Sequence, residues 1–282
     1  MRIAVTGAAG GLGGRVVGLL AERGDVDVVA MTRRSLPVGA FPARVSVAVA
    51  DYADPPALRA ALKGVDTLVL VSSDGPDARM LMHHRNQVAA AKAEGVGHVA
   101  ALSSVDADTA SPFCYAVVNG LTEELLLASG VPCSFARASL YMEFFRGWLV
   151  TARTTGLLRL PAGDGRVSLV ARDDVARALA ALAVGEPTGR HHDVTGPESA
   201  DLAGIAAVAA EVWETPVAYV DVPDRTYCAE TAADGLDPWW LYAFSSLFAS
   251  VREQRWDLVS DDGARLTGRS PLALRAFLSA DR

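Results

Sequence analysis

Three glycines near the start of the chain, Gly7, Gly10 and Gly13, follow a short apolar run with strand character. Apolar residues then recur at helical spacing as far as Gly24, so the glycines lie in a strand-to-helix turn. A helix N-terminus directs N–H groups and positive dipole charge at a bound anion. The turn predicts a dinucleotide-binding site, and the alternative is a glycine-rich turn that binds nothing. The residues expected to face the cofactor are Thr6, Gly7, Gly10, Gly11, Leu12 and Gly13.

Arg33 and Arg34 stand at the end of a second predicted strand, residues 27–32, where the adenosine ribose is recognised. An acidic residue there would accept a hydrogen bond from the ribose 2′-hydroxyl and select NAD. An arginine pairs instead with a 2′-phosphate and selects NADP. No Asp or Glu occurs between Met31 and Asp51, so the sequence favours NADP(H) over NAD(H), with Arg33 as the contact. The alternative is a pair of solvated loop arginines.

Asp51 and Tyr52 follow the third predicted strand, residues 45–49, and are expected beside the adenine ring. Asp51 could accept a hydrogen bond from the adenine amino group, or it could simply cap a turn. Serines end the next two predicted strands, residues 67–71 and 98–102, at the sheet edge where doubly wound folds bind ligands. We expect Ser72, Ser73 and Ser103 to contact the cofactor.

A possible proton donor for hydride-transfer chemistry follows the fifth strand. Tyr115 opens the next predicted helix, and the serine position before it is offered by Ser103 or Ser104. The G-x-x-G-x-x-G spacing resembles the short-chain dehydrogenase superfamily, whose members add Tyr-x-x-x-Lys at this point. Here Asn119 replaces the lysine, and an uncharged amide cannot lower the pKa of Tyr115 as an ammonium group does. The predicted catalytic residues are Ser104, Tyr115 and Asn119.

The elements that must position these residues alternate strand and helix through six strands. This rhythm predicts an α/β fold with a doubly wound parallel Rossmann sheet in the order 3-2-1-4-5-6, with a seventh strand possible near residues 191–196. After residue 138 the rhythm breaks, which predicts a smaller C-terminal α/β lobe. We expect an NADP-binding domain over residues 1–138 and a substrate-side lobe over 139–282, with residues 165–195 returning to the Rossmann part.

Bulk composition narrows the partners of this 282-residue chain. A net charge of −7 and the lack of a Lys/Arg cluster argue against direct nucleic-acid binding. Three scattered cysteines favour a reducing cytoplasm over a disulfide framework. The sequence shows no signal peptide, no transmembrane run and no metal-ligand spacing; His83 and His84 point in different directions on a helix. We expect a cytoplasmic protein without a membrane partner or a metal.

Motifs spread over nearly the whole chain resemble the NmrA-like atypical short-chain dehydrogenases, closest to the bacterial NADPH-dependent quinone oxidoreductase type 2 branch. Besides the glycine turn, they are Ala50-Asp51-Tyr52, His84-Arg85-Asn86, Ala107-Asp108-Thr109, Thr122-Glu123, Gly163-Asp164-Gly165 and Leu266-Thr267-Gly268-Arg269. The resemblance implies a Rossmann domain, NADP(H) binding and a substrate cleft between two lobes. The chain departs from that branch at Ala138, where an Asn is usual, and at Asn119, where a His is usual.

The replaced lysine bears on the substrate. Reducing a ketone forms an alkoxide, whereas reducing a quinone forms a phenolate-like oxygen with a pKa of about 10, which needs less help from an acid. We therefore predict hydride transfer from NADPH to a small quinone-like or other conjugated aromatic acceptor, in a pocket formed by Tyr141, Phe144 and Trp148. The alternatives are a catalytically weak NADP(H) sensor with a regulatory protein partner, and a sugar-nucleotide epimerase, which Asn119 disfavours. A homodimer is possible.

Overall fold

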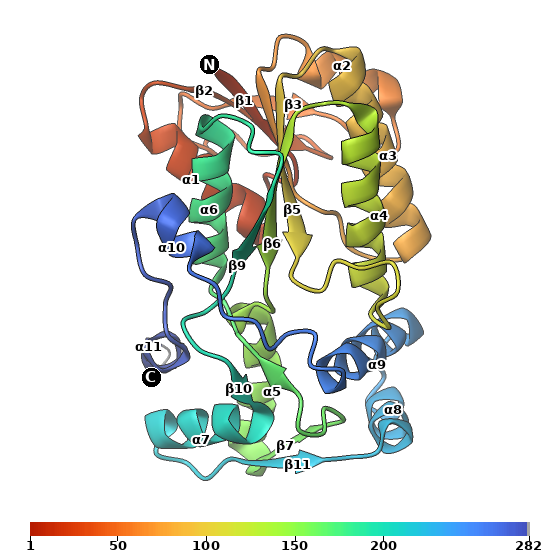
Figure 1. Cartoon of the computed structure of the whole chain (residues 1–282), viewed down its shortest axis with the longest axis vertical. Helices are drawn as coiled ribbons and strands as arrows, with labels where there is room; N and C mark the ends of the chain where they lie inside the picture. The colour runs from red at the N-terminus through yellow and green to blue at the C-terminus, as the bar shows by residue number, and fades with distance from the viewer. Residues whose placement is uncertain (281–282) are drawn as a thin grey trace.

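Seven parallel strands form the central sheet of the computed structural model, which describes residues 1–280. Their spatial order is β3-β2-β1-β4-β5-β6-β9 (Figure 1). The strands are β1 (Arg2–Val5), β2 (Asp27–Thr32), β3 (Ser46–Val49), β4 (Thr67–Leu70), β5 (His98–Ser104), β6 (Cys133–Ala138) and β9 (His191–Val194). The predicted doubly wound order is confirmed, and the possible seventh strand is present as β9, which pairs with β6.

Helices cover both faces of this sheet, as parallel strands require (Figure 1). One face carries α1 (Gly11–Glu22) and α6 (Arg172–Val184), whose Val16, Leu20 and Leu179 enter the core beneath them. The other face carries α2 (Pro55–Leu62), α3 (Asp77–Ala93) and α4 (Cys114–Ser129). Because both faces are covered, all four residues of β4 are buried. The sheet thus exposes little except its strand ends, where loops can form a site.

The strand order reverses at β1, because β2 lies on one side of it and β4 on the other. Thr6 holds this point together, because its hydroxyl accepts from the Val71 amide at 2.8 Å and lies 3.2 Å from the Val71 carbonyl oxygen. The loops after β1 and β4 therefore diverge from a rigid junction. Ligands of doubly wound sheets bind at such a reversal, outside the carboxyl ends of the strands.

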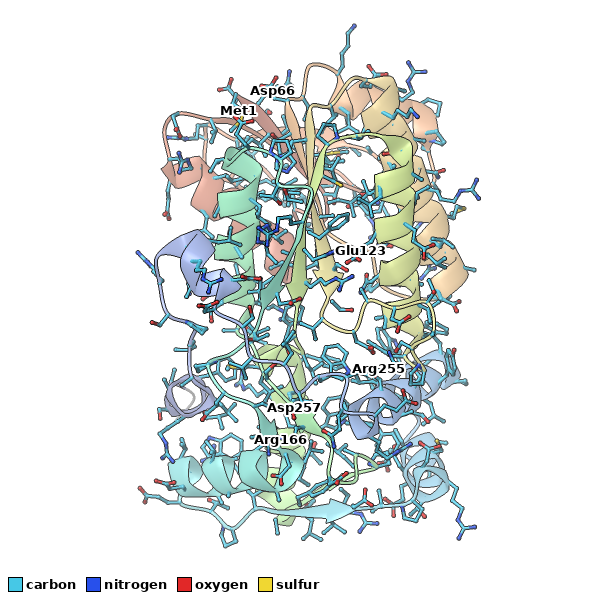
Figure 2. All side chains as sticks on the ribbon, in the orientation of Figure 1. Met1, Asp66, Glu123, Arg166, Arg255 and Asp257 are labelled. Carbon is cyan, nitrogen blue, oxygen red and sulfur yellow. The ribbon has the colours of Figure 1, made fainter. Side chains whose placement is uncertain are left out.

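The C-terminal lobe lies below the carboxyl edge of the sheet in Figure 1. Two small sheets pair β7 with β11 in parallel and β8 with β10 in antiparallel orientation. Phe145, Trp213 and Phe248 belong to the core of the lobe, and an ion pair joins Arg166 to Asp257 at 3.2 Å (Figure 2). The elements are α5 (Met142–Thr155), β7 (Leu157–Leu160), β8 (Arg166–Val167), β10 (Ala200–Asp201), α7 (Leu202–Trp213), β11 (Ala218–Asp221), α8 (Asp224–Ala233), α9 (Pro238–Arg252), α10 (Asp262–Thr267) and α11 (Leu274–Ser279).

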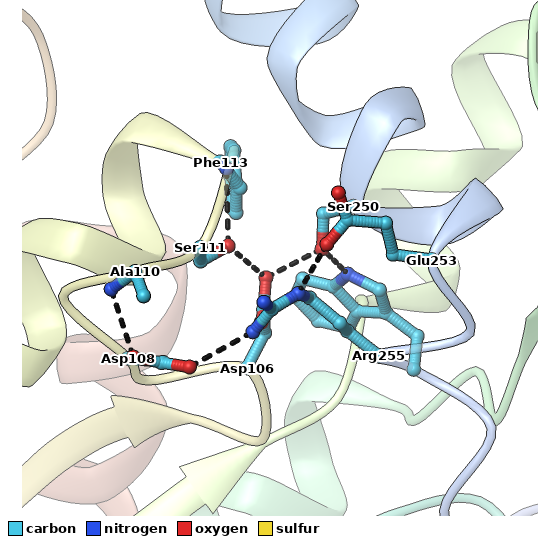
Figure 3. Close-up of polar contacts among 9 residues, drawn as sticks. Asp106, Asp108, Ala110, Ser111, Phe113, Ser250, Glu253 and Arg255 are labelled. Atoms are coloured by element: carbon cyan, nitrogen blue, oxygen red, sulfur yellow. Dashed lines mark hydrogen bonds and ion pairs between the residues drawn. The ribbon is translucent and has the colours of Figure 1, made fainter.

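A buried carboxylate ties the loop after β5 to the end of α9 (Figure 3). Asp106 accepts hydrogen bonds from the Ser111 hydroxyl at 2.7 Å and from the Ser250 hydroxyl. Arg255 donates to Asp108 at 2.9 Å and lies 3.4 Å from Asp106. Burial raises the pKa of Asp106 above its ordinary value, against the pull of these donors. This network sets α9 beside the start of α4.

Candidate functional site

The glycine turn has a backbone that only glycine can form. Gly7 has φ +61°, a left-handed conformation, and its carbonyl oxygen accepts from the Gly10 amide at 2.8 Å. A Cβ atom on Gly13 would lie 2.3 Å from that same carbonyl oxygen, so α1 packs against the turn at the closest possible distance. Gly10 and Gly11 are exposed, and no side chain caps α1. The result is an open anion cradle that fits the pyrophosphate of a dinucleotide.

Two residues of this segment contribute only through the backbone. Leu12 is buried under α1, so its amide alone can face a ligand. Thr6 is predicted to bind the cofactor, but its side chain is fully buried and its hydroxyl is engaged with β4. Its role in the structure is to hold the two strands together at the reversal, because a hydroxyl satisfied inside the sheet has no lone pair directed at the cradle.

Arg33 and Arg34 are exposed at the end of β2, where the adenosine ribose is expected. Tyr52 reaches back from the end of β3, and its hydroxyl accepts a hydrogen bond from the Gly7 amide. Burial raises the pKa of Tyr52, while the nearby charge of Arg33 acts in the opposite direction. Asp51 accepts from the Ala53 amide at 2.8 Å, so one of its oxygens caps the turn, which is the alternative considered for this residue.

Two residues of α3 to which the sequence analysis gave no part in cofactor binding, Asn86 and His83, support this side of the site. Asn86 of α3 donates to the Tyr52 carbonyl oxygen at 2.8 Å. His83 contacts the Tyr52 ring edge-on at 5.7 Å between ring centres, and its Nδ1 lies 3.2 Å from the Ser73 hydroxyl. Burial lowers the pKa of His83. Ser73 is therefore linked to α3, and Ser72 beside it is half-buried at the end of β4.

The two serines after the predicted fifth strand lie inside β5, which runs two residues further than expected. Successive side chains of a strand point to opposite faces. Ser103 therefore faces α4 and donates to Glu123 at 2.5 Å, rather than flanking the nicotinamide as predicted. Glu123 lies between α4 and the strands (Figure 2) and also binds Arg137 and His191. Ser104 faces the other way, and its buried hydroxyl has no hydrogen-bond partner within residues 1–280.

Tyr115 lies at the start of α4, against α9. Its hydroxyl accepts from the Gly75 amide at 3.1 Å, and its ring centre lies 6.3 Å from that of Trp239 and 6.5 Å from that of Trp240. Burial raises the pKa of Tyr115 above its ordinary value. Asn119, one turn further along α4, is half-buried and makes no side-chain hydrogen bond in the described part of the chain. The Tyr115 phenol therefore stays protonated at neutral pH, and its O–H can donate a hydrogen bond or a proton while its oxygen accepts from Gly75.

The three aromatic residues predicted to form the substrate pocket do not lie together around one open space. Trp148 packs inside the lobe, with its ring centre 5.0 Å from that of Phe144 and 5.1 Å from that of Phe248, so it belongs to the aromatic packing of the lobe. Phe144 is half-buried in the same cluster. Tyr141 stands apart from them, beneath the Arg172 guanidinium. Besides Phe113, whose ring centre lies 5.6 Å away, the rings beside Tyr115 belong to Trp239 and Trp240 of α9, which packs against α4.

Other kinds of site are missing from the part of the chain that the structure describes. No group of three or more His, Cys, Asp or Glu side chains is placed to hold a metal ion. None of the helices over residues 1–280 has the length and apolar character needed to cross a membrane.

A parallel sheet of this order, with a glycine turn at its reversal, defines a Rossmann-type NAD(P)-binding fold. A family model described as NAD(P)H-binding matches residues 7–185, and the chain belongs to this family. The resemblance to quinone oxidoreductase type 2 is also confirmed. Quinone oxidoreductase 2 of Escherichia coli is 33% identical over 83% of this chain and 82% of its own.

Two further similarities extend over almost the entire chain. The NAD(P)H azoreductase of Xenophilus azovorans is 28% identical and is covered over 97% of its length, against 99% of this chain. The crystal structure of the E. coli NADPH-dependent quinone oxidoreductase QOR2 with NADPH superposes with a TM-score of 0.89, at 28% identity and 99% coverage of both chains. The protein is thus an NAD(P)H-dependent oxidoreductase.

Proposed function

We propose that this protein transfers a hydride from NADPH to a quinone-like or other conjugated aromatic acceptor. The observation that carries the proposal is the neutral Tyr115 hydroxyl beside the rings of Trp239 and Trp240, without a cation on α4 to activate it. Similar proteins named quinone oxidoreductase and azoreductase support this acceptor class. Their acceptors share extended conjugation, which a hydride can enter without forming an alkoxide.

Each part of the site has a separate task in this proposal. The N-terminal turn of α1 binds the pyrophosphate, and the bound NADPH supplies the hydride at its nicotinamide ring. Ser104, with its unpaired buried hydroxyl, offers a hydrogen bond at the carboxyl end of β5. Tyr115 donates a hydrogen bond or a proton to the acceptor oxygen, and Trp239 and Trp240 hold a flat ring system against it.

The preference for NADPH over NADH rests on Arg33. It is exposed at the end of β2, and within residues 1–280 its guanidinium forms no ion pair. A 2′-phosphate placed there would gain two charge-assisted hydrogen bonds, whereas a 2′-hydroxyl would gain little. We also place the protein in the cytoplasm, because Cys114, Cys133 and Cys228 are all free thiols.

The experiment uses the purified protein, NADPH or NADH, and a panel of benzoquinones, naphthoquinones and azo compounds. Turnover is followed at the absorbance band of the reduced nicotinamide, with simple ketones as control acceptors. We expect oxidation of NADPH by at least one quinone or azo compound, and a kcat/KM about tenfold lower with NADH. Tight NADPH binding without oxidation by any acceptor would overturn the proposal in favour of a cofactor-sensing protein.

A further inference from the structure

Two helices begin side by side at the carboxyl edge of the sheet, and only one of them is closed by the chain itself. Both carboxylate oxygens of Glu143 accept from the Arg172 amide at 3.1 Å, so the N-terminus of α6 already holds an anion. The N-terminus of α1 has no side-chain cap, and Gly10 and Gly11 leave its first turn exposed. Of these two helix ends, that of α1 is therefore the one open to an external anion.

The side chain of Arg172 crosses from α6 to this open helix end. Its Nη1 lies 3.6 Å from the place where a Cβ atom on Gly11 would stand. Its guanidinium carbon lies 5.4 Å above the centre of the Tyr141 ring, which is a cation–π distance. Within residues 1–280 the guanidinium forms no hydrogen bond and no ion pair. The ring thus orients a cation whose five donors are all available.

A second arginine near Gly11 has its donors engaged. Arg15 donates to the Gly11 carbonyl oxygen at 2.7 Å, and its Nε pairs with Asp173. The charge of Arg15 is therefore balanced within the chain, while that of Arg172 is not. Arg15 therefore stabilises the helix end through contacts within the chain, whereas the Arg172 guanidinium is available to bind a ligand.

We propose that Arg172 binds the pyrophosphate of the cofactor, on the side opposite the amides of α1. The inference rests on the proposed binding of NADPH at the glycine turn. A guanidinium can donate two parallel hydrogen bonds to phosphate oxygens and adds a full charge to the partial charge of the helix end. Because Arg172 and Tyr141 follow β6 in the chain, the cofactor is held by residues from distant parts of the sequence. Nothing in the glycine pattern predicts this contact.

The test compares Arg172→Ala with Arg33→Ala by direct titration of NADPH, NADH and adenosine 2′-monophosphate. Arg172→Ala should weaken NADPH and NADH by a similar factor, about tenfold or more, and leave the pyrophosphate-free nucleotide unchanged. Arg33→Ala should weaken NADPH and the 2′-phosphate nucleotide, but not NADH. Arg15→Ala, the matched control at the same helix end, should change every affinity by less than about twofold.

The role of the ring is tested at Tyr141. Tyr141→Phe keeps the cation–π contact and should bind NADPH as the wild type does, whereas Tyr141→Leu should weaken both dinucleotides about threefold. Circular dichroism and thermal unfolding verify that each variant is folded. If Tyr141→Leu binds both dinucleotides as the wild type does, the Tyr141 ring does not contribute to cofactor binding.

The outcomes separate this inference from the proposed function. If Arg172→Ala binds both dinucleotides as the wild type does, the arginine assignment is wrong, even where quinone turnover is observed. If wild-type protein binds NADPH but reduces no acceptor, the acceptor proposal fails and a loss of affinity in Arg172→Ala still supports this inference. A wild-type protein that binds neither dinucleotide overturns both.

Discussion

The cofactor side and the acceptor side of the site are built in different ways. The glycine turn consists of backbone groups from one stretch, Gly7 to Gly13, whose conformation excludes a side chain at Gly7 and at Gly13. The acceptor side gathers Gly75, Tyr115 and Trp239 from three distant segments. The first depends on local backbone geometry and the second on packing between the Rossmann part and the lobe. Substitutions should therefore abolish binding on one side and retune it on the other.

Charge separates the two sides as well. The proposed cofactor side has the cations Arg33 and Arg172, which we expect to face an anionic ligand. The acceptor side presents a phenol with a raised pKa and two indole rings. We therefore expect phosphate charge to supply most of the cofactor affinity, and shape and one hydrogen bond to select the proposed acceptor.

The largest effect is expected from Gly13→Val. A Cβ atom there would lie 2.3 Å from the Gly7 carbonyl oxygen and 2.6 Å from its carbon, and these backbone atoms cannot move without opening the turn. We expect NADPH affinity to fall at least about 100-fold and the thermal midpoint to drop. Gly18→Ala is the control in the same helix, because its Cβ atom meets nothing within 4 Å. It should bind NADPH normally and gain about 0.5–1 kcal/mol of stability. Equal NADPH affinity in both variants would contradict the assignment of the glycine turn as the pyrophosphate-binding site.

Tyr115→Phe should break the acceptor side alone. Removal of the donor is expected to lower kcat about 100-fold with the NADPH dissociation constant unchanged. Because burial raises the pKa of Tyr115, the wild-type kcat should stay level from about pH 6 to about pH 9. Steady-state kinetics with a quinone measure both. Tyr242→Phe on the exposed face of α9 is the control, and a wild-type kcat in Tyr115→Phe would exclude the phenol as donor.

Helix α3 lies beside the proposed cofactor side, and α4 carries Tyr115 of the proposed acceptor side. The contact between these two helices should make the stability of the fold decrease in acid. His84 donates from Nδ1 to the Thr122 hydroxyl at 2.8 Å, since that hydroxyl donates to the Val118 carbonyl at 2.7 Å. Burial lowers the pKa of His84 to about 4. The folded state then binds fewer protons than the unfolded state, so stability is complete above about pH 6.5 and falls as the pH drops toward 4.

The expected loss between about pH 7 and about pH 5 is about 2 kcal/mol. Denaturant unfolding at the two pH values measures it. His84→Asn keeps a donor for Thr122 but does not titrate, so its loss should be smaller by that amount. An unchanged pH dependence in His84→Asn would assign the acid sensitivity to other groups.

The smallest effect is expected at the rim of the acceptor side. Trp240→Leu removes a ring that lies 6.5 Å from Tyr115 and 5.6 Å from Phe244, measured between ring centres. The KM for a naphthoquinone should rise about threefold to tenfold, with little change in NADPH affinity. Tyr242→Leu, half-exposed on the same helix, should leave the KM unchanged. Equal effects of both substitutions would indicate general loosening of α9 rather than an acceptor contact.

Particular residues show how far sequence reasoning reached. The strand order and the glycine turn are predictable, because hydrophobic periodicity and glycine spacing are local signals. The assignment of Ser103 fails because β5 runs two residues further than its apolar run, and strand alternation then turns the hydroxyl toward Glu123. A boundary error of two residues decides which serine faces a ligand. Including Ser103 and Ser104 in the predicted strand would have indicated that their hydroxyl groups lie on opposite faces of the sheet.

Other features carry no local signal. Glu143 and Arg172 are separated by 29 positions, and their hydrogen bonds exist only because α5 and α6 begin next to each other. The hydrogen bond from Gly7 to Tyr52 spans 45 positions. Neither pairing has a spacing pattern, because the intervening chain sets it. These contacts are visible only once the sheet has brought its loops together.

The sequence by itself determined the parallel order, the glycine turn and the basic character of the ribose end, because each depends on residue types close along the chain. Only the tertiary structure decided which of Ser103 and Ser104 is unpaired, which aromatic rings stand beside Tyr115, and which of two helix N-termini remains open. The physical reason is that hydrogen bonding and burial are properties of neighbours in space. The glycine turn near the start of the chain therefore predicts the class of ligand. The packing of α4, α6 and α9 determines which side chains surround that ligand.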